Sequence, residues 1–92
     1  MSRLRDPRGV QDLRTLPLVE VTWWDAASDS RWKTFGDARA EAHDGLLENQ
    51  TVGYVVKVGK HALTLAQTRS QNGKVSGDWS IPRRWIAKVV RK

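Results

Sequence analysis

The stretch from Thr51 to Val90 constrains the fold most, because it alternates short segments of β-type composition with turn residues. Thr51–Val58 is rich in β-branched residues. His61–Gln67 alternates between two faces with the period of two that a half-buried strand shows. Val75–Ile81 and Ile86–Val90 complete the series. The pattern therefore predicts four consecutive strands joined by short connections.

Glycine, asparagine and proline separate these segments. Gly59-Lys60 interrupts the first two, and Asn72-Gly73 suits the positive φ values of a tight turn. Pro82 has no amide hydrogen to give to a sheet, so we expect its strand to end there. The residues after Pro82 predict a single kinked turn before the last strand.

Leu18–Trp24 is predicted to be the first strand. Val19, Val21 and Trp23 share one face, which we expect to be buried, whereas Trp24 points the other way. An indole ring buries a large area and dominates a small core. Trp23 is therefore predicted to belong to the core, and Trp24 is open to either packing or a surface role.

A long connection, residues 25–50, follows this strand. Asp37 and the helix-forming residues of Ala38–His43 predict a short helix inside residues 36–44. Connections of this length are uncommon and often carry function. We therefore expect a binding edge here, and Trp32 stands out as an aromatic residue in polar surroundings.

The predicted order of elements favours one small all-β domain over residues 18–92. Five strands, a long first loop with a short helix and a Pro-containing turn before the last strand resemble an SH3-like barrel. An Sm-like or OB-like barrel is the alternative, because all three are short, strongly bent sheets. Residues 1–17 form a basic arm, which we expect to be flexible. A role in wrapping a phosphate backbone is the functional alternative for the arm.

Composition limits the chemistry. The chain has 92 residues, of which sixteen are Lys or Arg and ten are Asp or Glu, a net charge of +6. An excess of this size serves solubility or attracts anionic partners. There is no Cys and there are two His, so a four-ligand zinc site would need carboxylates and no thiolate is available. We predict a protein that is not an enzyme and uses no metal or cofactor.

The sequence also predicts where the protein works. No apolar run approaches the ~20 residues that a membrane span needs. No apolar stretch of signal-peptide type follows Met1, and the absence of Cys is typical of intracellular proteins. We therefore expect no membrane association.

Basic and aromatic residues together indicate a site for an anionic ligand that carries a base. Arg and Lys hold phosphates, and indole rings stack on bases. The candidate ligand-binding residues are Trp24, Asp25, Trp32, Lys57, Lys60, Arg83 and Arg84. The anionic group is expected at the two arginines and the flat surface at the two tryptophans. Trp79 and Trp85 are predicted to close the core, with stacking as the alternative.

Four short motifs resemble a group of small proteins encoded by tailed bacteriophages. The motifs are Val21-Thr22-Trp23-Trp24-Asp25-Ala26, Arg31-Trp32, Thr51-Val52-Gly53-Tyr54 and Ile81-Pro82-Arg83. The resemblance covers most of residues 18–90. It implies a phage accessory protein in the cytoplasm of the host, and it implies no activity.

Two functions follow as hypotheses. The first is capture of an anionic nucleotide, such as a second messenger of host defence. The second is binding of a macromolecule: DNA, RNA or a host enzyme.

Exposed Trp24 and Trp32 would be costly in water, which predicts a homo-oligomer, most simply a dimer. The site is expected at a subunit boundary, because a barrel this small has little room for a pocket of ~300 Å³.

Overall fold

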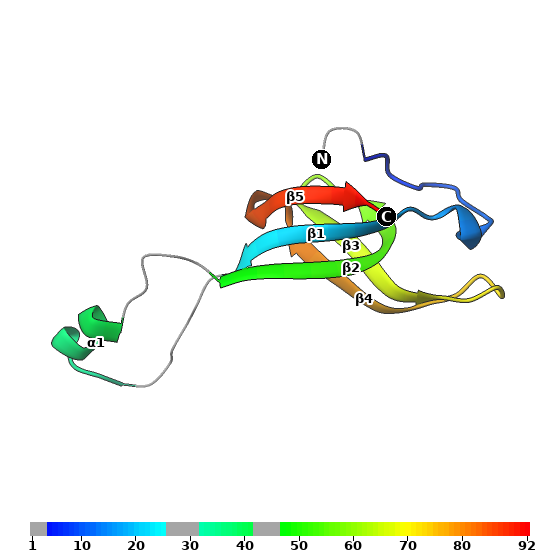
Figure 1. Ribbon diagram of the computed structural model, residues 1–92. Helices are drawn as coiled ribbons and strands as arrows, with labels where there is room; N and C mark the ends of the chain where they lie inside the picture. Colours follow the sequence, from blue (N-terminus) through cyan, green and yellow to red (C-terminus); the bar gives the residue numbers. More distant parts are fainter. Residues whose placement is uncertain (1–3, 26–31, 42–46) are drawn as a thin grey trace.

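The computed structural model describes residues 4–25, 32–41 and 47–92, which form five strands, one short helix and two 3₁₀ turns (Figure 1). The strands are β1 (Leu18–Asp25), β2 (Leu47–Val58), β3 (Ala62–Arg69), β4 (Val75–Pro82) and β5 (Ile86–Arg91). The other elements are η1 (Leu13–Thr15), α1 (Phe35–Glu41) and η2 (Arg83–Trp85). The predominantly β class predicted from the sequence is confirmed.

The five strands form one antiparallel sheet in the order β4-β3-β2-β1-β5. Strand β1 lies between β2 and β5 and pairs with both of them. Strands β4 and β5 are the two edges, so the sheet is not closed by pairing of the described residues. The prediction of five strands is thus confirmed, whereas a closed barrel is not.

Strand β2 begins four residues earlier than its composition predicts. The added residues are paired along β1, from Asp25 opposite Leu47 to Thr22 opposite Gln50. Three of these four residues, Glu48, Asn49 and Gln50, are polar, and the sequence of the four shows no strand pattern of its own. An antiparallel neighbour that satisfies their backbone hydrogen bonds explains the extension.

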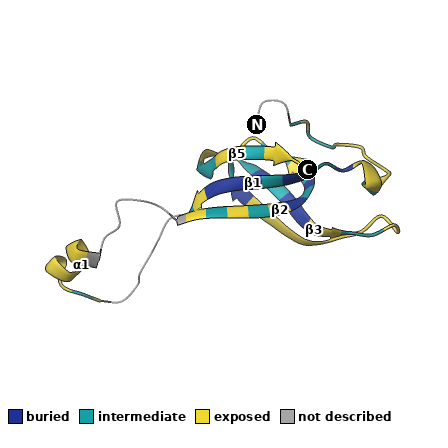
Figure 2. Cartoon of the chain, in the orientation of Figure 1, coloured by how far each residue is buried: buried dark blue, intermediate teal, exposed yellow. Residues whose placement is uncertain are grey.

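The core lies on one face of the curled sheet, where the buried residues gather (Figure 2). It consists of Val19, Val21, Trp23, Val55, Leu63, Leu65 and Ile81. The rings of Trp23 on β1 and Trp79 on β4 are only 5.5 Å apart between centroids, although β2 and β3 separate their strands in the sheet. Neighbouring strands lie ~4.8 Å apart, so this contact requires a strongly bent sheet.

Trp23 is the aromatic centre of this core. Its side chain is 6% exposed, stacks on Trp85 with 6.3 Å between ring centroids, and meets Trp79 edge-on. Its Nε1–H donates a hydrogen bond of 3.0 Å to the hydroxyl of Thr51. Trp24 is 40% exposed. The predicted division between Trp23 and Trp24 is confirmed and agrees with the alternation of side chains along a strand, although Thr22 is buried as well.

Two glycines are needed where they stand. Gly73 has a φ of 83° in the β3–β4 turn, which L-residues with a side chain rarely adopt. Gly53 in β2 lies close to the neighbouring strand β3, and a Cβ there would be 2.9 Å from the Cβ of Leu65 and 3.0 Å from the carbonyl oxygen of Ala66. The predicted turn at Asn72-Gly73 is therefore confirmed.

The N-terminal segment, residues 4–17, contacts the sheet at several points. Leu16 is buried, and Leu4 packs against the core. The backbone amide of Val55 donates to the carbonyl of Pro17 over 2.9 Å. The amide of Val58 donates to Oδ1 of Asp6 over 3.0 Å. The predicted flexibility of this arm stays a prediction, but its described residues have defined partners on the sheet.

The β1–β2 connection carries α1 outside the sheet (Figure 1). The helix spans Phe35–Glu41 and so begins one residue before the predicted range of 36–44; residues 42–44 of that range lie outside the described part. Trp32 is fully exposed, and Phe35 is 79% exposed. No helix among the described residues is both long and apolar enough to cross a membrane.

Candidate functional site

A groove of about 640 Å³ lies where the β2–β3 turn meets η2. It is lined by Lys60, His61, Ala62, Ser80, Pro82, Arg83 and Arg84. Three of the seven lining residues carry a fixed positive charge, and no carboxylate is among them. Because like charges gathered on a concave surface reinforce one another, the groove favours an anionic ligand.

Strand pairing brings the two sides of this groove together. Ala62, the first residue of β3, is opposite Pro82, the last residue of β4. Lys60 and His61 precede Ala62, and the arginines of η2 follow Pro82, so both groups leave the sheet at the same end. The backbone amide of Arg83 donates to the carbonyl of His61 over 2.9 Å.

The two arginines have different surroundings. Arg83 is partly buried, and its Nη1 donates to the carbonyl of Gly59 over 3.0 Å. That bond uses one of the five N–H donors of its guanidinium. Arg84 is exposed, and neither it nor Lys60 forms an ion pair with another described residue. Arg84 and Lys60 are therefore the cations most available to a ligand.

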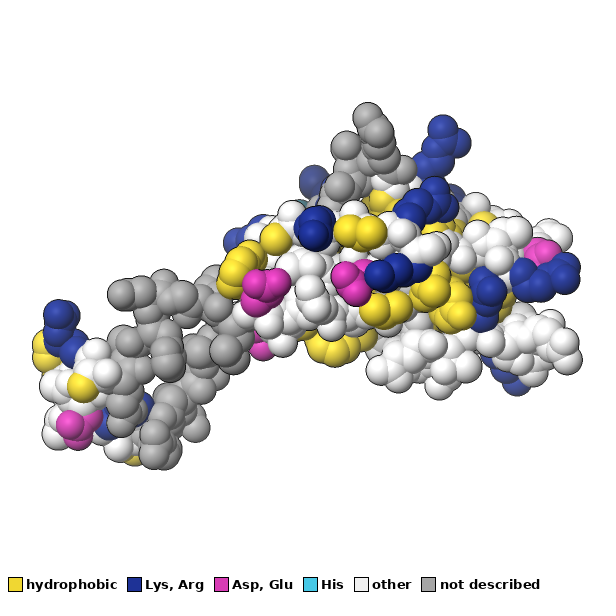
Figure 3. Space-filling model, viewed as in Figure 1, with side chains coloured by type: hydrophobic (Ala, Val, Ile, Leu, Met, Phe, Trp, Pro, Cys, Tyr) yellow, Lys and Arg dark blue, Asp and Glu magenta, His cyan; other side chains and the backbone are white. Residues whose placement is uncertain are grey.

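The net charge alone would not have located this groove. Lys and Arg side chains are spread over the face shown in Figure 3 rather than gathered in one patch. The groove differs from the rest of this surface in two ways: it is concave, and its lining contains cations but no Asp or Glu. Ala62 and Pro82 supply an apolar wall, and the hydroxyls of Thr64 and Ser80 are hydrogen-bonded to each other over 2.8 Å.

The structure brings some of the predicted site residues together and separates others. Lys60, Arg83 and Arg84 share the groove. Lys57 is not among its lining residues, although the Cε of Lys57 lies 3.9 Å from the position that a Cβ on Gly59 would take. The other three predicted residues, Trp24, Asp25 and Trp32, are not among its lining residues.

The aromatic residues predicted for stacking lie elsewhere. Trp24 and Asp25 end β1, with Asp25 opposite Leu47. Trp32 precedes α1 and is fully exposed. Trp79 and Trp85 pack on Trp23 as expected of core residues, although Trp79 remains 45% exposed. A flat stacking surface and the cationic groove are thus not assembled side by side within the described part of one chain.

His61 is a lining residue that the sequence did not single out. Nothing in its local sequence pattern marks it as a ligand-binding residue. Its position directly after Lys60, in the turn that precedes β3, was the one available signal. Ser80 likewise gains its place only through the pairing of β3 with β4.

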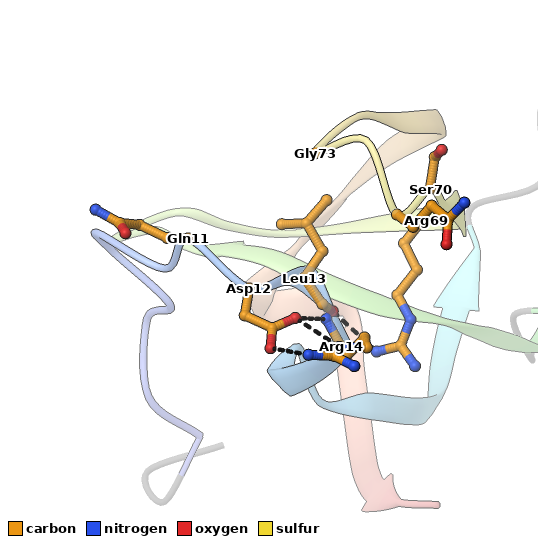
Figure 4. Close-up of a pocket in the computed structure, with 8 residues that line it drawn as sticks. Gln11, Asp12, Leu13, Arg14, Arg69, Ser70 and Gly73 are labelled. Carbon is orange, nitrogen blue, oxygen red and sulfur yellow. Dashed lines mark hydrogen bonds and ion pairs between the residues drawn. The ribbon is translucent and has the colours of Figure 1, made fainter.

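A second pocket, of about 490 Å³, lies between the N-terminal segment and the β3–β4 turn (Figure 4). Its arginines already have partners. Arg14 donates to both carboxylate oxygens of Asp12 over 2.9 to 3.0 Å. Arg69 donates to the carbonyl of Leu13 over 2.9 Å and lies 4.5 Å from the ring centroid of Tyr54.

The ion pair between Asp12 and Arg14 in this second pocket shifts the pKa values of both side chains. Hydrogen bonds from Arg14 hold the pKa of Asp12 below its ordinary value, and Asp12 raises the pKa of Arg14. A carboxylate that neutralises one arginine reduces the attraction of this pocket for anions. The groove at η2 is for this reason the stronger candidate site.

The described residues contain no group of three or more His, Asp or Glu side chains that could hold a metal ion. Comparisons with protein-family models, with curated proteins and with solved structures gave no significant match to this chain.

Proposed function

We propose that the protein is a non-catalytic binding protein that holds an anionic, base-containing ligand at the groove between the β2–β3 turn and η2. The observation that carries this proposal is the convergence of Lys60, Arg83 and Arg84 on one groove without a lining carboxylate. Guanidinium groups bind phosphate oxygens through several directed hydrogen bonds, whereas an ammonium acts as a mobile point charge. A phosphate group suits this combination.

The base of the ligand requires a flat or apolar surface. Ala62 and Pro82 provide a small one inside the groove. Trp24 and Trp32 lie outside it, and both are exposed. We therefore propose a homo-oligomer, most simply a dimer, in which an exposed tryptophan of a second copy completes the site. The bent five-stranded sheet, proposed to be a small SH3-like barrel, would present the groove at its rim.

The biological role we propose rests on the sequence motifs. Their resemblance to phage accessory proteins suggests action in the host cytoplasm. A small binder with a cationic site and no evident catalytic set would serve there by sequestering a nucleotide signal of host immunity. Such a role requires only tight binding, for which a groove with a fixed arginine is suited.

Isothermal titration calorimetry with cyclic nucleotides and ADP-ribose derivatives tests the proposal. Arg84→Ala should weaken binding by about 1.5–3 kcal/mol for a lost charged hydrogen bond, which is roughly 10- to 150-fold. Arg91→Ala is the matched control, because it removes the same charge from the other end of β5. That control should bind within about twofold of the wild type.

The outcome that would remove the proposal is the absence of heat with every compound of the panel. Equal weakening in Arg84→Ala and Arg91→Ala would show that net charge, and not the groove, attracts the ligand. Arg83→Ala is a poorer probe than Arg84→Ala. Its guanidinium also bonds the Gly59 carbonyl, so its loss is expected to affect the β2–β3 turn as well as the ligand.

Nucleic acid is the second candidate partner, and the positions along β5 favour it. Lys88, opposite Thr22, and Arg91 are exposed cations of β5, whereas the Nζ of Lys92 lies 3.6 Å from Oε2 of Glu20 and is therefore already paired. Phosphate contacts of this kind predict a steep fall of affinity with salt. A gel shift at low salt without a complex, on DNA and on RNA, would exclude this candidate.

A further inference from the structure

The β2–β3 turn that carries Lys60 is hydrogen-bonded at its start to two other segments of the chain. The backbone amide of Val58 donates to Oδ1 of Asp6 over 3.0 Å. Nη1 of Arg83 donates to the carbonyl of Gly59 over 3.0 Å. The two bonded backbone groups belong to consecutive residues. The turn is therefore fixed between the N-terminal segment and η2.

The turn itself is tight. The amide of Gly59 donates to the carbonyl of Ala62 over 2.9 Å, and a Cβ on Gly59 would be 3.0 Å from that oxygen. The carbonyl of His61 accepts from the amide of Arg83. The part of the turn that lines the groove thus has little freedom as long as its attachments persist.

Asp6 is an unusual attachment because it comes from far away in the sequence. It precedes Val58 by 52 positions, and its side chain is only 26% exposed. Its other oxygen, Oδ2, lies 3.5 Å from Nε of Arg8, an arginine that is itself 90% exposed. Near Asp6, Leu4 packs against the core and so holds the segment on the sheet.

We infer that Asp6 is a positioning residue for the groove, which it does not itself line. By accepting the Val58 amide, it holds the β2–β3 turn so that Lys60 faces the arginines of η2 before any ligand arrives. Binding then requires less ordering of the turn, which raises affinity. This inference rests on the proposed function, since it concerns the same groove.

The charge of Asp6 acts in the opposite sense. A carboxylate beside a cationic groove repels an anion, so a purely electrostatic role predicts tighter binding when it is removed. Positioning predicts weaker binding when the acceptor oxygen is removed. Asp6→Asn separates the two effects, because it keeps an acceptor oxygen and loses the charge.

The test is an NMR titration of the full chain with sodium pyrophosphate, which carries the phosphate chemistry of the proposed ligand. Backbone amide shifts of the residues around the groove report binding, and hydrogen exchange at the Val58 amide reports the bond to Asp6. Asp12→Ala is the matched control, because Asp12 is a second carboxylate of the same segment whose bonds stay within that segment. Arg84→Ala is the control for the groove.

We expect Asp6→Ala to raise the dissociation constant for pyrophosphate roughly three- to tenfold and to speed exchange at Val58. Asp6→Asn should stay close to the wild type or bind slightly more tightly, and Asp12→Ala should show neither effect. Should Asp6→Ala lose its dispersed spectrum, Asp6→Glu takes its place. It keeps the carboxylate, displaces it by one methylene, and is expected to weaken binding in the same direction.

Three results would overturn the inference in distinguishable ways. If Arg84→Ala binds weakly while Asp6→Ala binds like the wild type, the groove stands and Asp6 has no positioning role. If both Asp6 variants bind more tightly, its effect is electrostatic. If pyrophosphate shifts no amide around the groove of the wild type, the proposed function and the inference fail together.

Discussion

Replacing Trp23 by alanine tests the packing of the whole sheet, because this residue of β1 contacts side chains on β2, on β4 and in η2. The side chain is 6% exposed and contacts the rings of Trp79 on β4 and Trp85 in η2. Its indole N–H is bonded to Thr51 on β2. The substitution would remove two ring contacts and one hydrogen bond and leave a cavity among them.

The cost can be worked from the buried area. A buried aromatic side chain removes ~150–250 Å² from water, which at ~25 cal/mol per Å² amounts to about 4–6 kcal/mol. Extended-chain areas overstate burial, and large-to-small substitutions of this kind cost about 3–5 kcal/mol in practice. We expect that range for Trp23→Ala. A domain of this length has roughly 5–14 kcal/mol of stability in total, so most folded molecules could be lost at elevated temperature.

Urea denaturation followed by circular dichroism measures the effect. Trp24→Ala is the matched control, because it removes the same side chain from the opposite face, where it is 40% exposed. It should cost about 1–2 kcal/mol, since less area and no enclosed cavity are involved. Thr51→Val tests the hydrogen bond alone and should cost about 1 kcal/mol for a partly buried donor left without its acceptor. A Trp23→Ala protein as stable as Trp24→Ala would refute the assignment of the core.

Three further predictions concern packing, titration and assembly. Gly53→Ala should lower the free energy of unfolding by about 1–3 kcal/mol, because the added Cβ would lie 2.9 Å from the Cβ of Leu65. Gly36→Ala is the control and should not destabilise the protein, because a Cβ there has no atom within 4 Å. Thermal melts of the two variants measure the difference. Hydrogen bonds from Arg14 lower the pKa of Asp12 from its ordinary value of 3.8, so the stabilisation by this carboxylate is present above that pH and is lost as the pH falls below it through the lowered pKa. The difference in urea midpoint between wild type and Asp12→Asn should therefore shrink only as the pH falls below 3.8. Light scattering should return about twice 10.4 kDa at micromolar concentration, and the monomer mass contradicts the dimer.

The strands and the direction of their side chains could be predicted from the sequence. Alternation along Leu18–Trp24 placed Trp23 inside and Trp24 outside, because successive side chains of a strand point to opposite faces whatever the partner strand is. Pro82 marked the end of β4 because it has no amide hydrogen. These are local properties, carried by adjacent residues.

The groove depended on contacts between residues that lie far apart in the chain. Lys60 and Arg84 were both named from the sequence, but only the pairing of Ala62 with Pro82 brings them to the same end of the sheet. Trp24, near the end of β1, and Trp32, before α1, are not among the residues that line the groove. Local periodicity contains no information on which strand lies beside which, so the sequence listed the basic and aromatic residues without grouping them.

The first part of β2 and the N-terminal segment show the same division. Glu48-Asn49-Gln50 has no strand pattern and becomes strand because β1 pairs with it. In the sequence, Asp6 is one of two carboxylates in the basic arm, and nothing beside it indicates a partner. Its hydrogen bond with the Val58 amide exists only after the sheet has formed. Sequence alone determined which residues could face the core of this protein. Tertiary structure decided which cations share a groove and what holds them there, because hydrogen bonds between distant segments depend on the register of the folded sheet.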